Sequence, residues 1–258
     1  MRYVRYRTGG QVRWGQLEGE TIHELDADDV MSAPRRTGAS HELSEVSLLA
    51  PAEPTKIICL GMNYASHARE IGLPIPDDPA MFMKPVSSLA GPGEPIACPA
   101  RSQQVEHEAE LAFVMRRRVF RAGREESLAA VWGYTCANDV TARDIQRIGG
   151  NYLNVVWSKA YPAFCPIGPW IVVDEIDPDN VEVSCLVNGQ VRQRERTSDF
   201  IFDVATQIAW ISQIMPLEPG DLVLTGTPKG VGRLSPGDSV TIAISGIGEL
   251  TNPVVQGP

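Results

Sequence analysis

The stretch "VEHEAELAFV" (residues 105–114) carries glutamates at alternate positions, Glu106, Glu108 and Glu110. Successive side chains of a β-strand point to opposite faces, so in a strand these three carboxylates share one face. The intervening residues then point toward an apolar core. Carboxylates about 7 Å apart repel each other by about 2 kcal/mol at an effective dielectric constant of about 20. The row therefore raises the question of what makes its charge tolerable.

Short strand-like runs surround this stretch along the whole chain. In residues 1–50 the runs "YVRYR", "QVRWGQL" and "TIHEL" are separated by glycine-containing turns. The proline-rich stretch "APAEPT" (50–55) follows them. We therefore predict a small N-terminal β-rich domain over residues 1–50 and a main domain over residues 55–258.

Two further signals concern the second half of the chain. Asn188-Gly189 lies between two alternating runs, which is the strongest hairpin signal in the sequence. The stretch 198–215 has helical spacing of apolar residues, with Ser198 as the expected N-cap. Because strands are many and helices few, we predict a mostly β or α+β fold with antiparallel and mixed sheets, and not a doubly wound nucleotide-binding fold.

Composition excludes several classes of protein. The 258 residues have a formal net charge of −9 and show no basic stripe, so binding to nucleic acid is not expected. No segment resembles a signal peptide or reaches transmembrane length, so no membrane partner is expected either. Five cysteines without CxxC spacing are typical of buried thiols in a reducing compartment. We expect a cytoplasmic protein.

A divalent cation is one answer to the repulsion in the 105–114 stretch. A site made only of carboxylates suits hard cations such as Mg²⁺, Mn²⁺ or Ca²⁺. Asp139, in "ANDVTARD", offers a third oxygen ligand beside Glu108 and Glu110. The alternative is a solvated polar face on an edge strand, which the alternation by itself favours.

The segment "NYASHARE" places His67 and Glu70 three residues apart, on one face of a short helix. A carboxylate beside an imidazole fixes its tautomer and raises its basicity, as a general base requires. The alternative is a surface pair that contributes a few tenths of a kcal/mol, and the spacing alone favours it.

Two other segments suggest anion binding. "LTGTPKGVG" (224–232) matches neither a Walker loop nor a dinucleotide fingerprint, but its backbone N–H groups and the Thr227 hydroxyl could contact an anion. The alternative is a tight connection between strands. Lys159 lies among aromatic and apolar residues, where an ammonium group requires an anionic partner.

These motifs, in this order, resemble the fumarylacetoacetate hydrolase superfamily. The resemblance runs through "GMNYASHAREIG", "MFMKP", "VEHEAELAFVM", "GYTCANDVTARDIQ", "VNGQVRQ" and "LEPGDLVLTGTPKGVG" and covers essentially the whole chain. It implies a mixed β-roll with a few short helices, a homodimer, and Mg²⁺ or Mn²⁺ as cofactor, with Ca²⁺ as a substitute in crystals. The acylpyruvase, oxaloacetate decarboxylase and hydroxyheptadienedioate isomerase branch is the most similar.

The resemblance also implies roles for individual residues. Those implied to bind the metal are Glu108, Glu110 and Asp139, with Glu106 beside them in a supporting position. Those implied to be catalytic are the His67–Glu70 dyad, which activates water or moves a proton, and Lys159. Those implied to hold the substrate are Arg143 and Gln146, together with Lys159, at its oxo-acid end and Thr227 at its carboxylate.

The implied activity is metal-dependent cleavage of a C–C bond in a small 2-oxo acid of the acylpyruvate or fumarylpyruvate type, through a metal-chelated enolate. Decarboxylation or keto–enol isomerisation of an oxo-dicarboxylate uses the same motifs and remains an alternative. A catalytically silent, ligand-binding member is another. The sequence departs from the family pattern at Pro162, where an acid is common, and at Gly149-Gly150-Asn151. The resemblance implies that both departures lie where the distal part of the substrate or a neighbouring subunit is placed.

Overall fold

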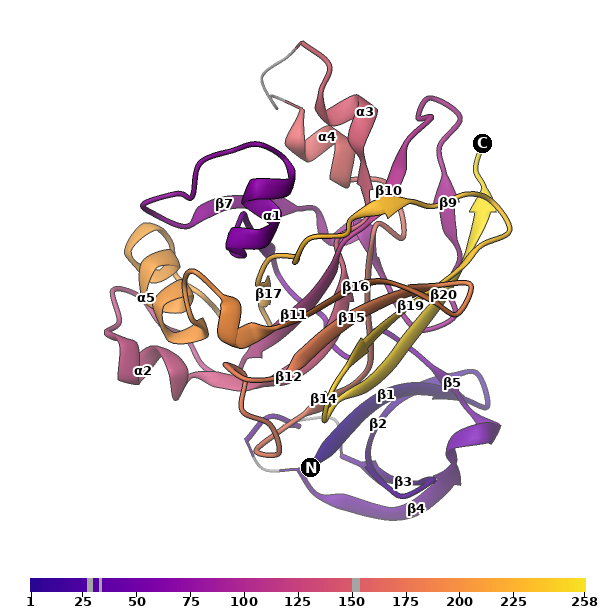
Figure 1. Ribbon diagram of the computed structural model, residues 1–258. Coiled ribbons are helices and arrows are strands. Elements are labelled where there is room, and N and C mark those ends of the chain that lie inside the picture. The colour runs from indigo at the N-terminus through magenta and orange to yellow at the C-terminus, as the bar shows by residue number, and fades with distance from the viewer. Residues whose placement is uncertain (27–29, 33, 150–153) are drawn as a thin grey trace.

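The structure, a computed structural model, describes residues 1–26, 30–32, 34–149 and 154–258. Its largest sheet has the strand order β4-β3-β2-β1-β14-β12-β11-β17-β6-β7, with β5 beside β1 and β8 beside β14 (Figure 1). Its strands are β1 (Arg2–Thr8), β2 (Gln11–Glu18), β3 (Thr21–Leu25), β4 (Arg36–Glu42), β5 (Ser47–Leu48), β6 (Ile57–Gly61), β7 (Ala80–Lys84), β8 (Leu89–Ala90), β11 (Ala109–Met115), β12 (Val131–Asn138), β14 (Cys165–Val172) and β17 (Leu222–Leu224).

Two smaller sheets complete the β structure. One has the order β13-β10-β18, the other β16-β15-β19-β20-β9. Their strands are β9 (Ile96–Cys98), β10 (Val105–His107), β13 (Thr141–Ala142), β15 (Glu182–Val187), β16 (Gln190–Arg196), β18 (Gly232–Arg233), β19 (Ser239–Ile244) and β20 (Gly248–Gln256). Most neighbouring strands are antiparallel, but β17–β6, β14–β8 and β20–β9 are parallel. The predicted mostly β, mixed-sheet fold is confirmed.

The helices are short and lie outside the sheets (Figure 1). They are α1 (Ala65–Glu70), α2 (Arg124–Leu128), α3 (Arg143–Gln146), α4 (Val155–Lys159) and α5 (Val204–Ile214), with 3₁₀ turns at Leu43–Glu45, Val86–Ser88 and Thr197–Asp199. The predicted N-cap of the longest helix is wrong. Asp203 caps α5, since its side chain accepts a hydrogen bond from the Thr206 N–H at 2.8 Å, whereas Ser198 lies in the preceding 3₁₀ turn.

The stretch 105–114 forms two strands instead of one, with Glu108 at the break between β10 and β11. Strand β11 lies inside the main sheet between β12 and β17, and all seven of its residues are buried. Leu111 and Phe113 pack into one apolar cluster, and Ala112 and Val114 pack into another. A solvated edge strand is therefore excluded, because both faces of this strand are covered.

Other local expectations can be compared with the structure. Asn188 and Gly189 have φ values of 52° and 75° and join β15 to β16 as the predicted hairpin. The five cysteines are buried free thiols, as expected. The N-terminal strands extend the main sheet, because β1 pairs with β14. Among the described residues, no helix is long and apolar enough to cross a membrane.

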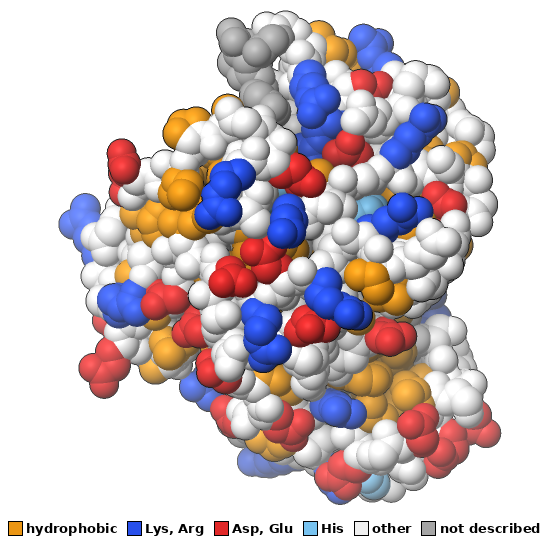
Figure 2. All heavy atoms as spheres, in the orientation of Figure 1, with side chains coloured by type: hydrophobic (Ala, Val, Ile, Leu, Met, Phe, Trp, Pro, Cys, Tyr) orange, Lys and Arg blue, Asp and Glu red, His pale blue; other side chains and the backbone are white. Residues whose placement is uncertain are grey.

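The surface carries charges of both signs. On the face in Figure 2, blue lysine and arginine side chains are interspersed with red aspartate and glutamate side chains, and no basic stripe crosses this face. Of the unusual segment 149–151, Gly150 and Asn151 lie outside the described residues. Pro162 follows Tyr161, whose ring packs against Phe164 with the centroids 5.1 Å apart.

Candidate active site

Strand pairing brings three carboxylates together. Glu108 lies at the break before β11, Glu110 lies within β11, and Asp139 directly follows β12. The Asp139 N–H donates to the Glu108 carbonyl oxygen at 2.9 Å, which fixes the two strand ends beside each other. One carboxylate oxygen from each of the three residues lies within 4.8 Å of the others, and all three residues are buried. The predicted triad is thus a geometric cluster, while Glu106 lies outside it.

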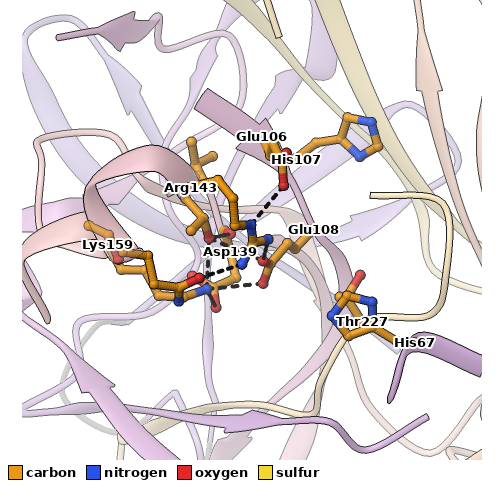
Figure 3. Close-up of polar contacts among 12 residues, drawn as sticks. His67, Glu106, His107, Glu108, Asp139, Arg143, Lys159 and Thr227 are labelled. Atoms are coloured by element: carbon orange, nitrogen blue, oxygen red, sulfur yellow. Dashed lines mark hydrogen bonds and ion pairs between the residues drawn. The ribbon is translucent and has the colours of Figure 1, made fainter. Parts of the chain in front are cut away.

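Basic side chains surround this acidic cluster (Figure 3). Lys159 Nζ lies 3.0 Å from Glu108 Oε2 and 2.6 Å from Asp139 Oδ2. Lys84 Nζ, also buried, lies 2.5 Å from the other oxygen of Asp139. Arg143 forms ion pairs with Glu108 and, from Nε at 2.8 Å, with Glu106. Glu106, Glu108 and Asp139 therefore each have at least one cationic partner.

Glu110 differs from its neighbours. Among the described residues it has no ion pair, and its Oε2 accepts a hydrogen bond from the Gly226 N–H at 2.6 Å. Burial, with Asp139 and Glu108 close by, raises the pKa of Glu110 well above 4.5. Burial alone would raise the pKa of Glu108 too, but Lys159 and Arg143 hold that pKa below its ordinary value.

The donor set suits a hard divalent cation. Three buried carboxylates offer oxygen ligands only. Among the described residues, Glu110 has no cationic side chain paired with its carboxylate. A divalent ion held by Glu108, Glu110 and Asp139 would supply this missing positive charge and would allow Glu110 to ionise. Mg²⁺ and Mn²⁺ both fit this chemistry.

Binding of such an ion is expected to release a proton. Because burial and the neighbouring carboxylates raise the pKa of Glu110, an ion that binds its carboxylate competes with a proton, so affinity should increase with pH. Calorimetric titration with Mn²⁺ in buffers of different ionisation enthalpy should detect this proton release. Glu110→Gln should bind Mn²⁺ weakly and release no proton. An Mn²⁺ affinity independent of pH, with no buffer dependence, would contradict this assignment.

The predicted dyad is formed on α1. His67 Nδ1 lies 3.1 Å from Glu70 Oε2, and His67 is buried. When Nδ1 donates to Glu70, Nε2 is the ring nitrogen that can accept a proton. Glu70 uses its other oxygen to accept a hydrogen bond from the Gly230 N–H at 2.9 Å. A fully exposed surface pair is excluded because the imidazole is buried, whereas Glu70 is exposed and accepts hydrogen bonds at both oxygens.

A cavity of about 300 Å³ has His67 of the dyad and Glu108 of the acidic cluster in its wall. Its polar wall contains the predicted residues His67, Glu108, Arg143, Gln146 and Lys159. Its remaining wall is formed by Gly61, Met62, Ile71, Leu73, Phe82 and Val155. The cavity therefore has a charged part and an apolar part.

Thr227 lies near His67 but its hydroxyl is already engaged (Figure 3). Its Oγ1 donates to the Ala109 carbonyl oxygen at 2.9 Å and accepts from Gln193 Nε2 at 2.8 Å. Gln146 Oε1 accepts from Arg143 Nη1 at 2.7 Å, so the guanidinium is held by its own helix. The structure thus brings all the predicted site residues into one region.

Sequence reasoning missed two buried polar residues here. Lys84, in "MFMKP", neutralises Asp139, and Gln193 contacts the strand that carries the carboxylates. A signal for Lys84 was present, since a lysine in an apolar strand raises the same question as Lys159. The other residues of β16 are mostly polar and exposed, so no local signal distinguished Gln193.

Comparison with family models gives two matches. Residues 56–255 match the model described as fumarylacetoacetate (FAA) hydrolase C-terminal. Residues 1–51 match the model described as Rv2993c-like, N-terminal.

Similar proteins carry several activities in their names. Oxaloacetate tautomerase fahd2, mitochondrial, from Xenopus laevis is 43% identical over 82% of this chain and 69% of its own length. The crystal structure of 5-carboxymethyl-2-hydroxymuconate delta-isomerase from Mycobacterium smegmatis has a TM-score of 0.91 at 43% identity, covering 99% of this chain and 100% of that chain. The maleylpyruvate hydrolase of Sphingobium sp. SYK-6, crystallised with manganese(II) and pyruvate, has a TM-score of 0.82 at 32% identity and full coverage of both chains.

Proposed function

The chain belongs to the fumarylacetoacetate hydrolase family, and from that premise we propose that it is a divalent-metal-dependent hydrolase that cleaves a C–C bond in a small acylpyruvate. The cavity carries this proposal. It joins a general-base pair and a metal-ligating cluster to an apolar wall. The hydrolase crystallised with manganese(II) and pyruvate supports a metal and a pyruvate-like end for the ligand.

The two parts of the cavity favour an uncharged acyl tail. The lysine and arginine side chains that line it, Lys159 and Arg143, lie at the acidic cluster. Ile71 and Leu73 are apolar residues of the wall, and Phe82 lies beside a charge, with Lys159 Nζ 4.8 Å from its ring centroid. A second carboxylate in the apolar part would lose water without gaining a cation, which is costly. An acylpyruvate with an aliphatic tail avoids this cost.

The chain's own residues supply the proton transfer and the binding. A divalent ion held by the three carboxylates would polarise the 2-oxo and carboxylate oxygens of the substrate. His67, oriented by Glu70, removes a proton from water as the water oxygen attacks the acyl carbonyl carbon. The bond from that carbon to the pyruvate methylene breaks. His67 then gives the proton that it took from water to this methylene carbon. Lys159 and Arg143 stabilise the negative charge that develops on the pyruvate oxygens.

A second candidate is keto–enol tautomerisation of oxaloacetate. Its support is the 43% identity to the oxaloacetate tautomerase of Xenopus laevis. It needs the same proton transfer by His67 without attack by water. The apolar part of the cavity favours it less, since oxaloacetate has two carboxylates.

A substrate comparison tests the proposal. Purified protein with Mn²⁺ or Mg²⁺ should release pyruvate from aliphatic acylpyruvates, and EDTA should abolish the release. Fumarylpyruvate, whose tail ends in a carboxylate, should be a poorer substrate, because the apolar part of the cavity offers that carboxylate no cation. Metal-dependent keto–enol interconversion of oxaloacetate, without loss of CO₂ and without pyruvate release from any acylpyruvate, would instead select the tautomerase.

A further inference from the structure

Strand β16 presents two polar side chains toward the site. Gln193 is buried and Glu195 is half-buried, whereas the residues that alternate with them, Arg192, Arg194 and Arg196, are exposed. This strand belongs to the sheet β16-β15-β19-β20-β9, whereas Glu110 lies in the main sheet. It therefore reaches the site from a separate layer of the fold.

The amide of Gln193 is fully hydrogen-bonded. Its Oε1 accepts from His107 Nδ1 at 3.0 Å and from the Ala109 N–H at 3.0 Å. These two residues flank Glu108 at the break between β10 and β11. Its Nε2 donates to Thr227 Oγ1 and to the Pro228 carbonyl oxygen, both at 2.8 Å. One side chain thus links the His107 imidazole and the Ala109 backbone, on either side of Glu108, to the loop at Thr227.

Glu195 makes a corresponding contact to the dyad helix. Its Oε2 accepts from Ser66 Oγ at 2.7 Å, and Ser66 precedes His67 on α1. The loop after Thr227 also touches both elements, because the Gly230 N–H binds Glu70. Gly230 has a φ of 94°, and a Cβ there would lie 2.3 Å from the Arg192 carbonyl oxygen, so only glycine allows this approach.

We propose that Gln193 and Glu195 are positioning residues of the site: Gln193 orients Glu108 for the metal and Thr227 for the substrate, and Glu195 holds α1 with His67 over the cavity. The inference rests on the proposed function for the substrate and the dyad. The part that concerns Glu108 depends only on metal binding. Hydrogen-bond partners of ligating residues commonly change metal affinity by about 10- to 100-fold when they are removed.

The first test distinguishes the role of the Gln193 oxygen from the role of its N–H donors. Titration calorimetry measures the affinity for Mn²⁺ and, in excess Mn²⁺, the affinity for oxalate. Gln193→Met should weaken Mn²⁺ binding by about tenfold or more. Gln193→Glu keeps the acceptor for His107 and Ala109 but loses both N–H donors, so it should retain Mn²⁺ affinity and weaken oxalate binding. The control Gln190→Met, exposed on the same strand, should change neither.

Several outcomes decide this first part. Wild-type Mn²⁺ affinity in Gln193→Met overturns it. If Gln193→Met does not fold, Gln193→Glu decides: weaker oxalate binding with Mn²⁺ affinity retained supports the inference, and equal losses overturn it. Both measurements use binding alone, so they stand even if no acylpyruvate is turned over.

The second test concerns Glu195 and uses kcat beside Mn²⁺ affinity. Ser66→Ala and Glu195→Ala should lower kcat by about tenfold or more while Mn²⁺ affinity stays at the wild-type value. Glu195→Gln still offers an oxygen to the Ser66 hydroxyl and should restore kcat. A wild-type kcat in Ser66→Ala and Glu195→Ala overturns the role of Glu195. A kcat in Glu195→Gln as low as in Glu195→Ala overturns it too.

Discussion

His67→Ala is expected to reduce kcat by about 10²–10⁴-fold while leaving Mn²⁺ affinity near the wild-type value. His67 lines the cavity but does not belong to the carboxylate cluster proposed to hold the ion, so its loss should remove a proton acceptor and not a metal ligand. Its Nδ1 contact to Glu70 is local to α1, and the remaining fold should be unaffected. Acylpyruvate turnover and Mn²⁺ calorimetry on the same preparation measure the two effects.

Two further variants sharpen this prediction. Glu70→Gln keeps a side-chain oxygen for Nδ1 but removes the negative charge that stabilises an imidazolium, so it should lose activity less severely. His23→Ala, in β3 and outside the cavity, is the matched control and should be fully active. A loss of Mn²⁺ affinity in His67→Ala would make this histidine a ligand, and the proposed proton transfer would have to be withdrawn.

Lys159→Met is expected to destabilise the metal-free protein by about 3–5 kcal/mol, because it leaves buried carboxylates without a partner. Lys159 Nζ contacts Glu108, Asp139 and, at 2.7 Å, Thr141 Oγ1. Although burial alone would lower the pKa of Lys159, Asp139 and Glu108 raise it above its ordinary value, so the side chain is an ammonium ion. Denaturant unfolding with and without Mn²⁺ measures the effect.

Mn²⁺ should restore part of this loss, because a divalent ion neutralises the same carboxylates. The increase in Tm caused by Mn²⁺ should therefore be larger in Lys159→Met than in the wild type, while kcat falls by about 10²-fold or more for lack of the charge near the developing oxyanion. Lys56→Met is the matched control. Lys56 pairs with buried Asp221 away from the cavity, so its loss should destabilise the protein without any extra response to Mn²⁺. An equal response to Mn²⁺ in both variants would show that Lys159 does not neutralise the metal-ligating carboxylates.

Short-range spacing determined much of the site. Glu110 in β11 and Glu108 at the break just before it lie two positions apart, and His67 and Glu70 lie on one helical turn, so sequence spacing alone indicated both pairs. Asn188-Gly189 likewise fixed its hairpin, because few residues adopt positive φ at two successive positions. These features depend on neighbours within a few residues, so the sequence alone predicts them.

The tertiary structure decided how the charges are paired. Sequence reasoning required an anion for Lys159, but only the packing of α4 against the strand ends shows that this anion is the acidic cluster, through Glu108 and Asp139. The tertiary structure also pairs Lys84 with Asp139. It leaves Glu110 without an ion pair among the described residues. The pKa shifts of Glu108, Glu110 and Lys159 depend on these spatial neighbours. The local sequence does not indicate which residues become neighbours.

The long-range contacts explain the remaining misses. Asp203 instead of Ser198 begins α5, since residues 200–203 are tied to Asn63, which accepts from the Phe202 N–H at 2.9 Å. Gln193 joins residues 84 positions apart in the chain through its contact to Ala109. Such contacts depend on the order and register of strands in separate sheets, and a local pattern of side chains does not encode them. The sequence by itself thus determined which chemical groups the site contains, and the packing of the sheets determined which of them meet.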